Sequence, residues 1–170
     1  MTTLRRIASI SSLFLSRPRY RTAPFTTSTV RTMIYPGGCY CGAIRYEVNL
    51  DSPDDARMSI CHCPNCKKFT GSENGITAKI PWKSFKIVKG ETKKHKKDNG
   101  SGTLLTREFC GECGSGILEY GANAGDNTYV FYGSLDEPDS LPPKGEFFGK
   151  YRAKWMPEIP GLFHKNEVKE

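Results

Sequence analysis

Seven cysteines carry most of the chemistry that this sequence offers, and each has another cysteine two or three residues away. They form the groups Cys39-x-Cys41, Cys61-x-Cys63-x-x-Cys66 and Cys110-x-x-Cys113. An odd number rules out a complete disulfide framework within one chain. Clustered thiols at these spacings are typical of metal sites in a reducing compartment, and zinc prefers soft thiolate ligands in a tetrahedron. The sequence therefore predicts that the chain binds zinc.

Two of the three groups are suited to one closed zinc site. In an extended segment, residues i and i+2 point to the same side, so Cys39 and Cys41 can reach one ion. The turn Cys110-Gly111-Glu112-Cys113 brings two more thiolates together. Four protein thiolates complete the tetrahedron, which is typical of a structural site. This site would join two segments that are far apart in the chain.

The remaining group leaves one zinc position free, as catalytic sites do. Cys61 and Cys63 share a face, and a turn at Pro64-Asn65 is expected to return Cys66 to the same ion. His62 lies between two ligands and should point away from the metal, although its ligation stays an alternative. A grouping of Cys61, Cys63 and Cys110 is also compatible with the spacing. The prediction of seven ligands for two ions does not depend on that pairing.

The elements that must position these thiols read as strands, and the expected fold class is all-β in a single domain over residues 34–170. Apolar or alternating runs predict strands at residues 44–48, 58–61, 76–80, 85–89, 103–109, 116–120 and 128–135. The loop with Asn99-Gly100 suggests a hairpin between residues 85–89 and 103–109. No window from residue 34 onward has sustained helical periodicity. The proline-rich stretch from Asp136 onward is expected to be mostly irregular and to wrap over the sheets.

The first 33 residues differ in composition from the rest. The formal net charge of the chain is +7, from 25 basic and 18 acidic residues. Residues 1–33 contain no acid and six arginines: Arg5, Arg6, Arg17, Arg19, Arg21 and Arg31. Without them, 19 basic residues face 18 acidic ones, so the remainder is close to neutral.

Residues 1–33 resemble a mitochondrial presequence, which is rich in Arg and Ser and poor in acids. An amphipathic helix is expected before Pro18, with Leu4, Ile7 and Phe14 on its apolar side. The predicted location is the mitochondrial matrix, or the cytoplasm if Met33 is the start. A secretory signal and a tail with no address are the alternatives. No apolar run approaches the ~20 residues that span a bilayer, so no membrane association is expected.

Three segments carry a resemblance to a known family. They are Gly38-Cys39-Tyr40-Cys41-Gly42, Cys61-His62-Cys63-Pro64-Asn65-Cys66-Lys67-Lys68 and Phe109-Cys110-Gly111-Glu112-Cys113-Gly114-Ser115. With Gly71-Ser72, Gly133-Ser134-Leu135-Asp136 and Arg152 to Trp155, they resemble the glutathione-dependent formaldehyde-activating enzyme family. That family also includes centromere protein V. The resemblance extends over roughly residues 35–164.

The resemblance implies a β-tent fold of stacked antiparallel sheets and two zinc ions per chain. It implies that Cys39, Cys41, Cys110 and Cys113 hold the structural zinc, and that Cys61, Cys63 and Cys66 hold the catalytic one. The implied reaction is the addition of glutathione to formaldehyde, giving S-(hydroxymethyl)glutathione, which makes the chain a carbon–sulfur lyase run in reverse. A small thiol and a small aldehyde are thus the expected partners.

The chemistry of this reaction gives candidate roles to residues beside the open zinc. His62 or a water would supply the proton to the adduct. Lys67, Lys68 and Arg152 are candidates to pair with the carboxylates of glutathione, with plain surface charge as the alternative for each. Lys67 stands where many relatives carry arginine, and Phe69-Thr70 is bulkier than in some relatives. These departures bear on which thiol or aldehyde fits.

A binding module without catalysis is the alternative function. Its best support is the basic run Lys93-Lys94-His95-Lys96-Lys97, which could meet nucleic acid or tubulin. The run is expected to be a solvated hairpin tip, and one basic loop on a near-neutral domain gives weak, salt-sensitive binding at most. Nucleic acid is therefore not an expected partner. A redox or zinc-buffering role for Cys110 and Cys113 would require that pair to be free of metal.

Overall fold

The computed structural model describes residues 32–100 and 102–167. Of the predicted leader, only Thr32 and Met33 lie within this part, so the targeting prediction falls outside the described residues. The strands are β1 (Met33–Gly38), β2 (Arg45–Leu50), β3 (Arg57–Cys61), β4 (Gly75–Pro81), β5 (Phe85–Lys89), β6 (Thr92–Asp98), β7 (Leu104–Cys110), β8 (Gly116–Gly121), β9 (Asn127–Phe131), β10 (Gly145–Phe147) and β11 (Phe163–His164). An α-helix, α1 (Pro64–Thr70), follows β3.

Six short 3₁₀ turns connect these strands within the described part of the chain. They are η1 (Pro53–Asp55), η2 (Trp82–Ser84), η3 (Ala122–Ala124), η4 (Tyr132–Ser134), η5 (Pro138–Ser140) and η6 (Gly149–Tyr151). None of the described helices is long and apolar enough to cross a membrane.

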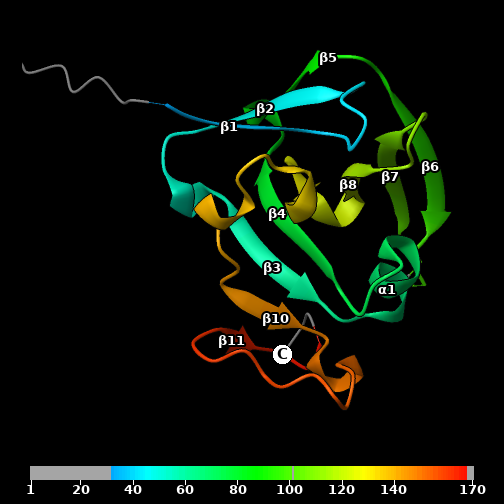
Figure 1. Ribbon diagram of the computed structural model, residues 1–170. Coiled ribbons are helices and arrows are strands. Elements are labelled where there is room, and N and C mark those ends of the chain that lie inside the picture. The colour runs from blue at the N-terminus through cyan, green and yellow to red at the C-terminus, as the bar shows by residue number, and fades with distance from the viewer. Residues whose placement is uncertain (1–31, 101, 168–170) are drawn as a thin grey trace, which may run out of the picture.

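The strands form two sheets. The smaller has the order β1-β2-β5, and the larger has the order β11-β10-β3-β4-β9-β8-β7-β6. Pairing is antiparallel except at β10, which is parallel to both β3 and β11. In Figure 1, β1 and β2 cross the upper end of the larger sheet, and β10 and β11 lie at its lower edge. The prediction of an all-β fold is therefore confirmed.

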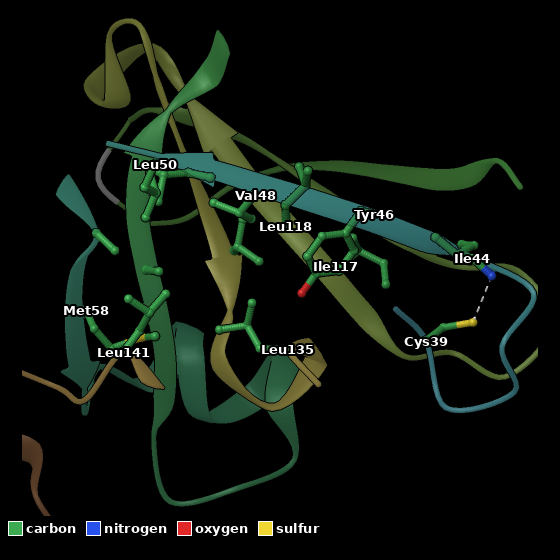
Figure 2. Close-up of a cluster of buried hydrophobic side chains, with 14 of the residues drawn as sticks. Cys39, Ile44, Tyr46, Val48, Leu50, Met58, Ile117, Leu118, Leu135 and Leu141 are labelled. Atoms are coloured by element: carbon green, nitrogen blue, oxygen red, sulfur yellow. Dashed lines mark hydrogen bonds between the residues drawn. The ribbon is translucent and has the colours of Figure 1, made fainter. Parts of the chain in front are cut away.

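The hydrophobic core lies between the two sheets. Alternate residues of β2 (Tyr46, Val48 and Leu50) are at most 2% exposed, because residues two apart in a strand share a face. Figure 2 shows them packed beside Ile117 and Leu118 of β8. The alternation of apolar and charged residues at 44–48 thus marks a half-buried strand, as predicted.

The opposite face of the larger sheet is not part of this core. In β3, Met58 and Ile60 are buried, while Arg57, Ser59 and Cys61 alternate with them. The β4 strand follows the same rule, since its Ala78 and Ile80 are buried. Two-residue periodicity therefore turns Cys61 away from the core and toward the face on which the candidate site is built.

The predicted hairpin has the correct turn but the wrong first strand. Residues 93–97 are not a loop tip, because they lie in β6, which pairs with β7 from Thr92↔Cys110 to Asp98↔Leu104. The strand at residues 85–89 belongs instead to the smaller sheet, where it pairs with β2. The sequence hid β6 because the strand is exposed on both faces and has no apolar alternation to reveal it. Its lysines protect a sheet edge from pairing with other chains.

The sequence analysis also missed the helix α1 and the first strand, β1. The helix occupies the segment where a turn at Pro64-Asn65 was expected. Its boundaries are nevertheless marked in the sequence, because Pro64 takes the first helical position and Gly71 ends the helix in a left-handed conformation (φ 65°). Seven residues are too few to show a helical period. The C-terminal stretch is mostly irregular, as predicted, apart from β10, β11 and two short turns.

Candidate metal centres

Four sulfur atoms from two distant turns meet at one point. Cys39 and Cys41 come from the turn between β1 and β2, and Cys110 and Cys113 from the turn between β7 and β8. The four sulfurs all lie within 4.8 Å of one another. The Sγ atoms of Cys39 and Cys41 are 3.5 Å apart, and those of Cys41 and Cys110 are 3.8 Å apart. These distances match the edge of a tetrahedron with zinc–sulfur bonds of ~2.3 Å, which is ~3.8 Å.

Hydrogen bonds to sulfur hold this cluster in place. The N–H of Ile44 donates to Cys39 Sγ at 3.2 Å, and this bond appears as a dashed line in Figure 2. Ser115 Oγ lies 3.2 Å from Cys113 Sγ and accepts from the N–H of Tyr40. The Ser115 hydroxyl lowers the pKa of Cys113 to about 5. At Cys113 the surroundings therefore favour thiolate, the form that binds metal. At Cys41 the N–H of Ala43 lowers the pKa, but the thiols of Cys39 and Cys113 outweigh it and raise that pKa to about 12.

A second cluster contains the other three cysteines. The sulfurs of Cys61 at the end of β3, Cys63 before α1 and Cys66 within α1 lie within 4.8 Å of one another. Cys63 caps the helix, where its Sγ accepts the N–H of Cys66 at 3.3 Å. Gly75 on β4 lies directly beneath, because a Cβ there would be only 3.1 Å from Cys66 Cβ. The sulfurs therefore fall into the grouping of four and three that the spacing favoured.

The three thiols strongly perturb one another. The neighbouring thiols of Cys61 and Cys66 hold the pKa of Cys63 far below its usual range. The same contacts raise the pKa values of Cys61 and Cys66. All three side chains are partly exposed rather than buried. The cluster is thus partly accessible, whereas the four-cysteine cluster has two buried members, Cys39 and Cys110, and two exposed ones, Cys41 and Cys113.

A cavity of about 680 Å³ opens beside the three-cysteine cluster, on the outer face of the larger sheet. Cys61 and Cys66 line it, together with aromatic rings from α1, β9, β10 and β11. Its size is within the range of ligand pockets, which are mostly apolar with a few polar groups. This cavity is the space in which a reactant can approach the cysteines.

Arg107 and Glu119 occupy neighbouring strands in the wall of this cavity. Their side chains pair at 2.8 Å between Nε and Oε2, and the Arg107 guanidinium stacks on the Phe69 ring at 4.2 Å. Burial raises the pKa of Glu119. Arg107 is 8% exposed, and its Nη2 is buried with no hydrogen-bond partner among the described residues. Such an orphaned N–H costs about 1–3 kcal/mol, which the oxygen of a bound reactant would offset.

His62 lies outside both thiol clusters and is fully buried. Its Nδ1 is 2.9 Å from Glu73 Oε2, and its Nε2 is 2.9 Å from Glu146 Oε1. Burial by itself would raise the pKa of Glu146. The hydrogen bond with His62 and the charge of Arg152 outweigh this effect, so the pKa of Glu146 is lowered. Both ring nitrogens are therefore engaged, which agrees with a supporting role and leaves neither free to protonate an adduct.

Two of the three predicted glutathione contacts are already paired within the protein. Lys67 contacts Glu73 and donates to the Tyr151 carbonyl at 2.6 Å. Arg152 is 3.2 Å from the buried Glu146. Lys68 is exposed on α1. None of the three lines the cavity beside Cys61 and Cys66.

Sequence reasoning did not single out several residues that the structure brings to this place. Arg107, Glu119, Glu73 and Glu146 lie between 7 and 80 residues from the nearest cysteine of the three-membered cluster in the printed sequence. Glu119 had one available signal, since a single charged residue in the otherwise apolar strand β8 is expected to face away from the core, whereas Arg107 follows Thr106 and precedes Glu108 and shows no alternation. Nothing local marks Glu146, because its partners come from three separate segments.

The sequence profile of the glutathione-dependent formaldehyde-activating enzyme family matches residues 34–151, a span with all seven cysteines. No curated protein matches the chain. Among solved structures, the crystal structure of a Rhodobacter sphaeroides protein, a structural genomics target, is similar to it. The two share 23% sequence identity with a TM-score of 0.47, and the match covers 59% of this chain and 87% of the other.

Proposed function

Since this chain belongs to the glutathione-dependent formaldehyde-activating enzyme family, we propose that it adds a thiol, with glutathione as the first choice, to a small aldehyde. In this reaction a bond forms between the thiol sulfur and the carbonyl carbon. The electron pair of the C=O bond moves to oxygen, which takes up a proton in place of the one that the thiol loses. The single observation that carries the proposal is the accessible three-cysteine cluster in the wall of a ligand-sized cavity.

The chemistry of the donor sets supports two zinc ions. Sets made only of thiolates select zinc, copper(I) or iron–sulfur clusters over hard cations. Cys39, Cys41, Cys110 and Cys113 would hold a structural ion, and the spacing of their sulfurs fits a tetrahedron. Cys61, Cys63 and Cys66 would hold the second. When bound by three protein thiolates, zinc keeps one position for an incoming thiol and lowers the pKa of that thiol.

Side chains of the cavity are suited to the oxygen of the aldehyde. Arg107 has a buried N–H that no described residue accepts, and a donor of this kind stabilises negative charge that develops on a carbonyl oxygen. Glu119, paired with Arg107, lines the same cavity as Cys61 and Cys66. We assign proton donation to Glu119 in place of His62, because both nitrogens of His62 are bound to carboxylates.

The proposal is tested by metal analysis and adduct formation with the Cys63→Ser variant. Wild-type protein prepared with its cysteines reduced should contain two zinc ions per chain. It should also accelerate the exchange between free glutathione and its formaldehyde adduct, which NMR measures. The variant should keep one zinc and its circular dichroism spectrum but lose glutathione binding and acceleration, because serine is a poor zinc ligand. Glu91→Gln, at an exposed position, is the control.

Two results would contradict the proposal. A folded Cys63→Ser variant that binds glutathione as tightly as the wild type would exclude the cluster as the reaction site. Wild-type protein that binds neither glutathione nor other small thiols would favour the binding-module alternative, with the lysines of β6 as its surface.

A further inference from the structure

The cavity beside the three cysteines is built in rows by the strand register. Arg57, Lys79 and Tyr129 are cross-strand neighbours on β3, β4 and β9, and so form one row. The next row on the same face contains Ser59, Thr77 and Phe131. The third row holds Cys61 opposite Gly75. All of these residues line the cavity, which therefore has a cationic end, an aromatic middle and a cysteine end.

The distance between the two ends follows from strand geometry. Arg57 and Cys61 are four residues apart on β3, which at a rise of ~3.3 Å per residue separates their Cα atoms by ~13 Å. Part of this length is taken up by the Arg57 and Lys79 side chains at one end and by the cysteine cluster at the other. The remaining space suits a ligand with a flat body about one ring long, which would join a reacting carbon at the cysteine end to an anionic group at the cationic end.

The walls of the middle section are aromatic. Phe69 and Phe131 stack with their ring centroids 5.5 Å apart, and Phe147 and Phe163 meet edge-to-face at the same separation. Phe163 packs so closely on Gly145 that a Cβ there would lie 2.2 Å from the ring. Phe148 completes the wall in a left-handed conformation (φ 58°), which is costly for a bulky residue and is a feature of functional sites. Formaldehyde is too small to contact these rings.

The charge at the far end is unbalanced. Arg57, Lys79 and Lys144 line this end of the cavity, whereas Glu119 is the cavity's one carboxylate among the described residues, and it is paired with Arg107. Lys144 contacts Asp54. Neither Arg57 nor Lys79 has a carboxylate partner in the part of the chain that the structure describes. A ligand with an anionic end would satisfy this row.

We propose that the aldehyde used by this chain has an aromatic or extended apolar body that ends in an anionic group. The proposal rests on the proposed function, because it names the electrophile of that same reaction. The thiol attacks the aldehyde carbon at the cysteine end, the body lies against Phe131 and Phe163, and the anion lies beside Arg57 and Lys79. The product is a hemithioacetal, formed by the same balanced addition as with formaldehyde.

The test compares 4-formylbenzoate with formaldehyde as the partner of glutathione. We expect kcat/KM for 4-formylbenzoate to exceed that for formaldehyde by about tenfold or more, because the apolar body adds contacts. Phe163→Ala and Lys79→Met should each lower kcat/KM for 4-formylbenzoate about tenfold and leave the formaldehyde value unchanged within about twofold. Trp155→Ala and Lys83→Met, both at exposed positions outside the cavity, are the matched controls.

A binding measurement separates this proposal from the proposed function. The alcohol 4-(hydroxymethyl)benzoate has the same body and anion but no electrophilic carbon. Calorimetry should show that it binds the wild type and the two control variants alike, and binds Phe163→Ala and Lys79→Met about tenfold more weakly. If the alcohol binds in this way and no aldehyde reacts, the ligand class is supported and the thiol-addition function fails.

Other outcomes overturn the inference about the aldehyde. One is that the alcohol does not bind, or that it binds the cavity variants as tightly as the wild type. Another is that Lys79→Met slows the reaction of glutathione with formaldehyde as much as with 4-formylbenzoate. The cationic row would then serve the carboxylates of glutathione, and the electrophile would remain small.

Discussion

At the scale of single residues, the site depends on which polar atoms have partners and which do not. His62 is fully buried but engaged at both nitrogens by carboxylates. Arg107 has an N–H that no described residue accepts. Glu119 lines the same cavity as Cys61 and Cys66, and burial raises the pKa of its carboxyl group. Glu119 is therefore the proton donor that we propose, and the buried His62 is held between two carboxylates next to Cys61 and Cys63.

Replacing Glu119 by Gln tests this assignment. The amide keeps the size of the side chain and can still accept from Arg107, but it cannot give up a proton. We expect adduct formation to slow by about 100-fold, the lower end of the range for general acid catalysis, while glutathione binding changes little. Because burial raises the pKa of Glu119, more of it is protonated near neutrality than an exposed glutamate.

The pH profile adds a second readout for Glu119. In the wild type, the rate should fall as the pH rises through the pKa of Glu119, and this decline should be absent in Glu119→Gln. Stopped-flow or NMR exchange rates over the pH range measure it, with the exposed Glu91→Gln as control. An unchanged rate and an unchanged profile would remove Glu119 from the mechanism.

At the scale of elements, β10 and the segment after it are joined to the cysteine loop by buried charges. Glu146 on β10 is 0% exposed and contacts His62 from the loop after β3. It also meets Arg152, at 3.2 Å, and His164 of β11, at 2.7 Å. The parallel pairing of β10 with β3 brings these groups together. One carboxylate thus connects the support of the three-cysteine loop with the cavity wall that carries Phe163.

Glu146→Gln should destabilise the protein by about 3 kcal/mol at pH 7, because it removes the buried negative charge that pairs with Arg152. The native pKa of Glu146 is lowered, so its stabilising contribution is present above the unfolded value of about 4.3 and is lost as the pH falls through the native pKa. The stability difference between wild type and variant should therefore shrink below about pH 4.

Urea denaturation of both proteins, each in the same metal state, measures this difference. Glu137→Gln, at an exposed position, is the control. A variant as stable as the wild type at pH 7 would show that the Glu146 network does not stabilise the fold. A difference that is constant with pH would show that the charge of Glu146 is not the cause.

At the scale of the whole molecule, the four-cysteine cluster joins the two sheets. It links the turn after β1, in the smaller sheet, with the turn after β7, in the larger sheet, across 69 residues between Cys41 and Cys110. The three-cysteine cluster connects only β3 and α1, which follow each other directly. A metal in the first cluster would therefore constrain the global fold, and a metal in the second would order a local loop.

Cys113→Ser should consequently cost much more stability than Cys63→Ser. We expect the loss of a ligand at the first cluster to lower Tm by at least about 10 °C, because binding energy at such a site is folding energy. Cys63→Ser should lower Tm by only a few degrees, roughly the effect of 1 kcal/mol. Calorimetric scans of both zinc-loaded variants test this. Equal Tm values for the two variants would contradict the division into a structural and a local cluster.

The sequence by itself determined the parts of this protein that depend on near neighbours. The Cys-x-Cys and Cys-x-x-Cys spacings hold their sulfurs together because two or three residues of backbone leave little freedom. Alternation in residues 44–48 marked β2, because one face of that strand is buried in the core. The family resemblance followed from these same short motifs, and the profile match over residues 34–151 agrees with it.

The tertiary structure alone decided which distant groups meet. β6 has lysines on both exposed faces, so no alternation could reveal it, and only pairing with β7 makes it a strand. The assignment of residues 85–89 to the smaller sheet likewise depends on β2. Glu146 beside His62, and the row of Arg57, Lys79 and Tyr129, result from strand register. Register is set by the burial of whole sheet faces, a property of all the strands together that no local segment contains.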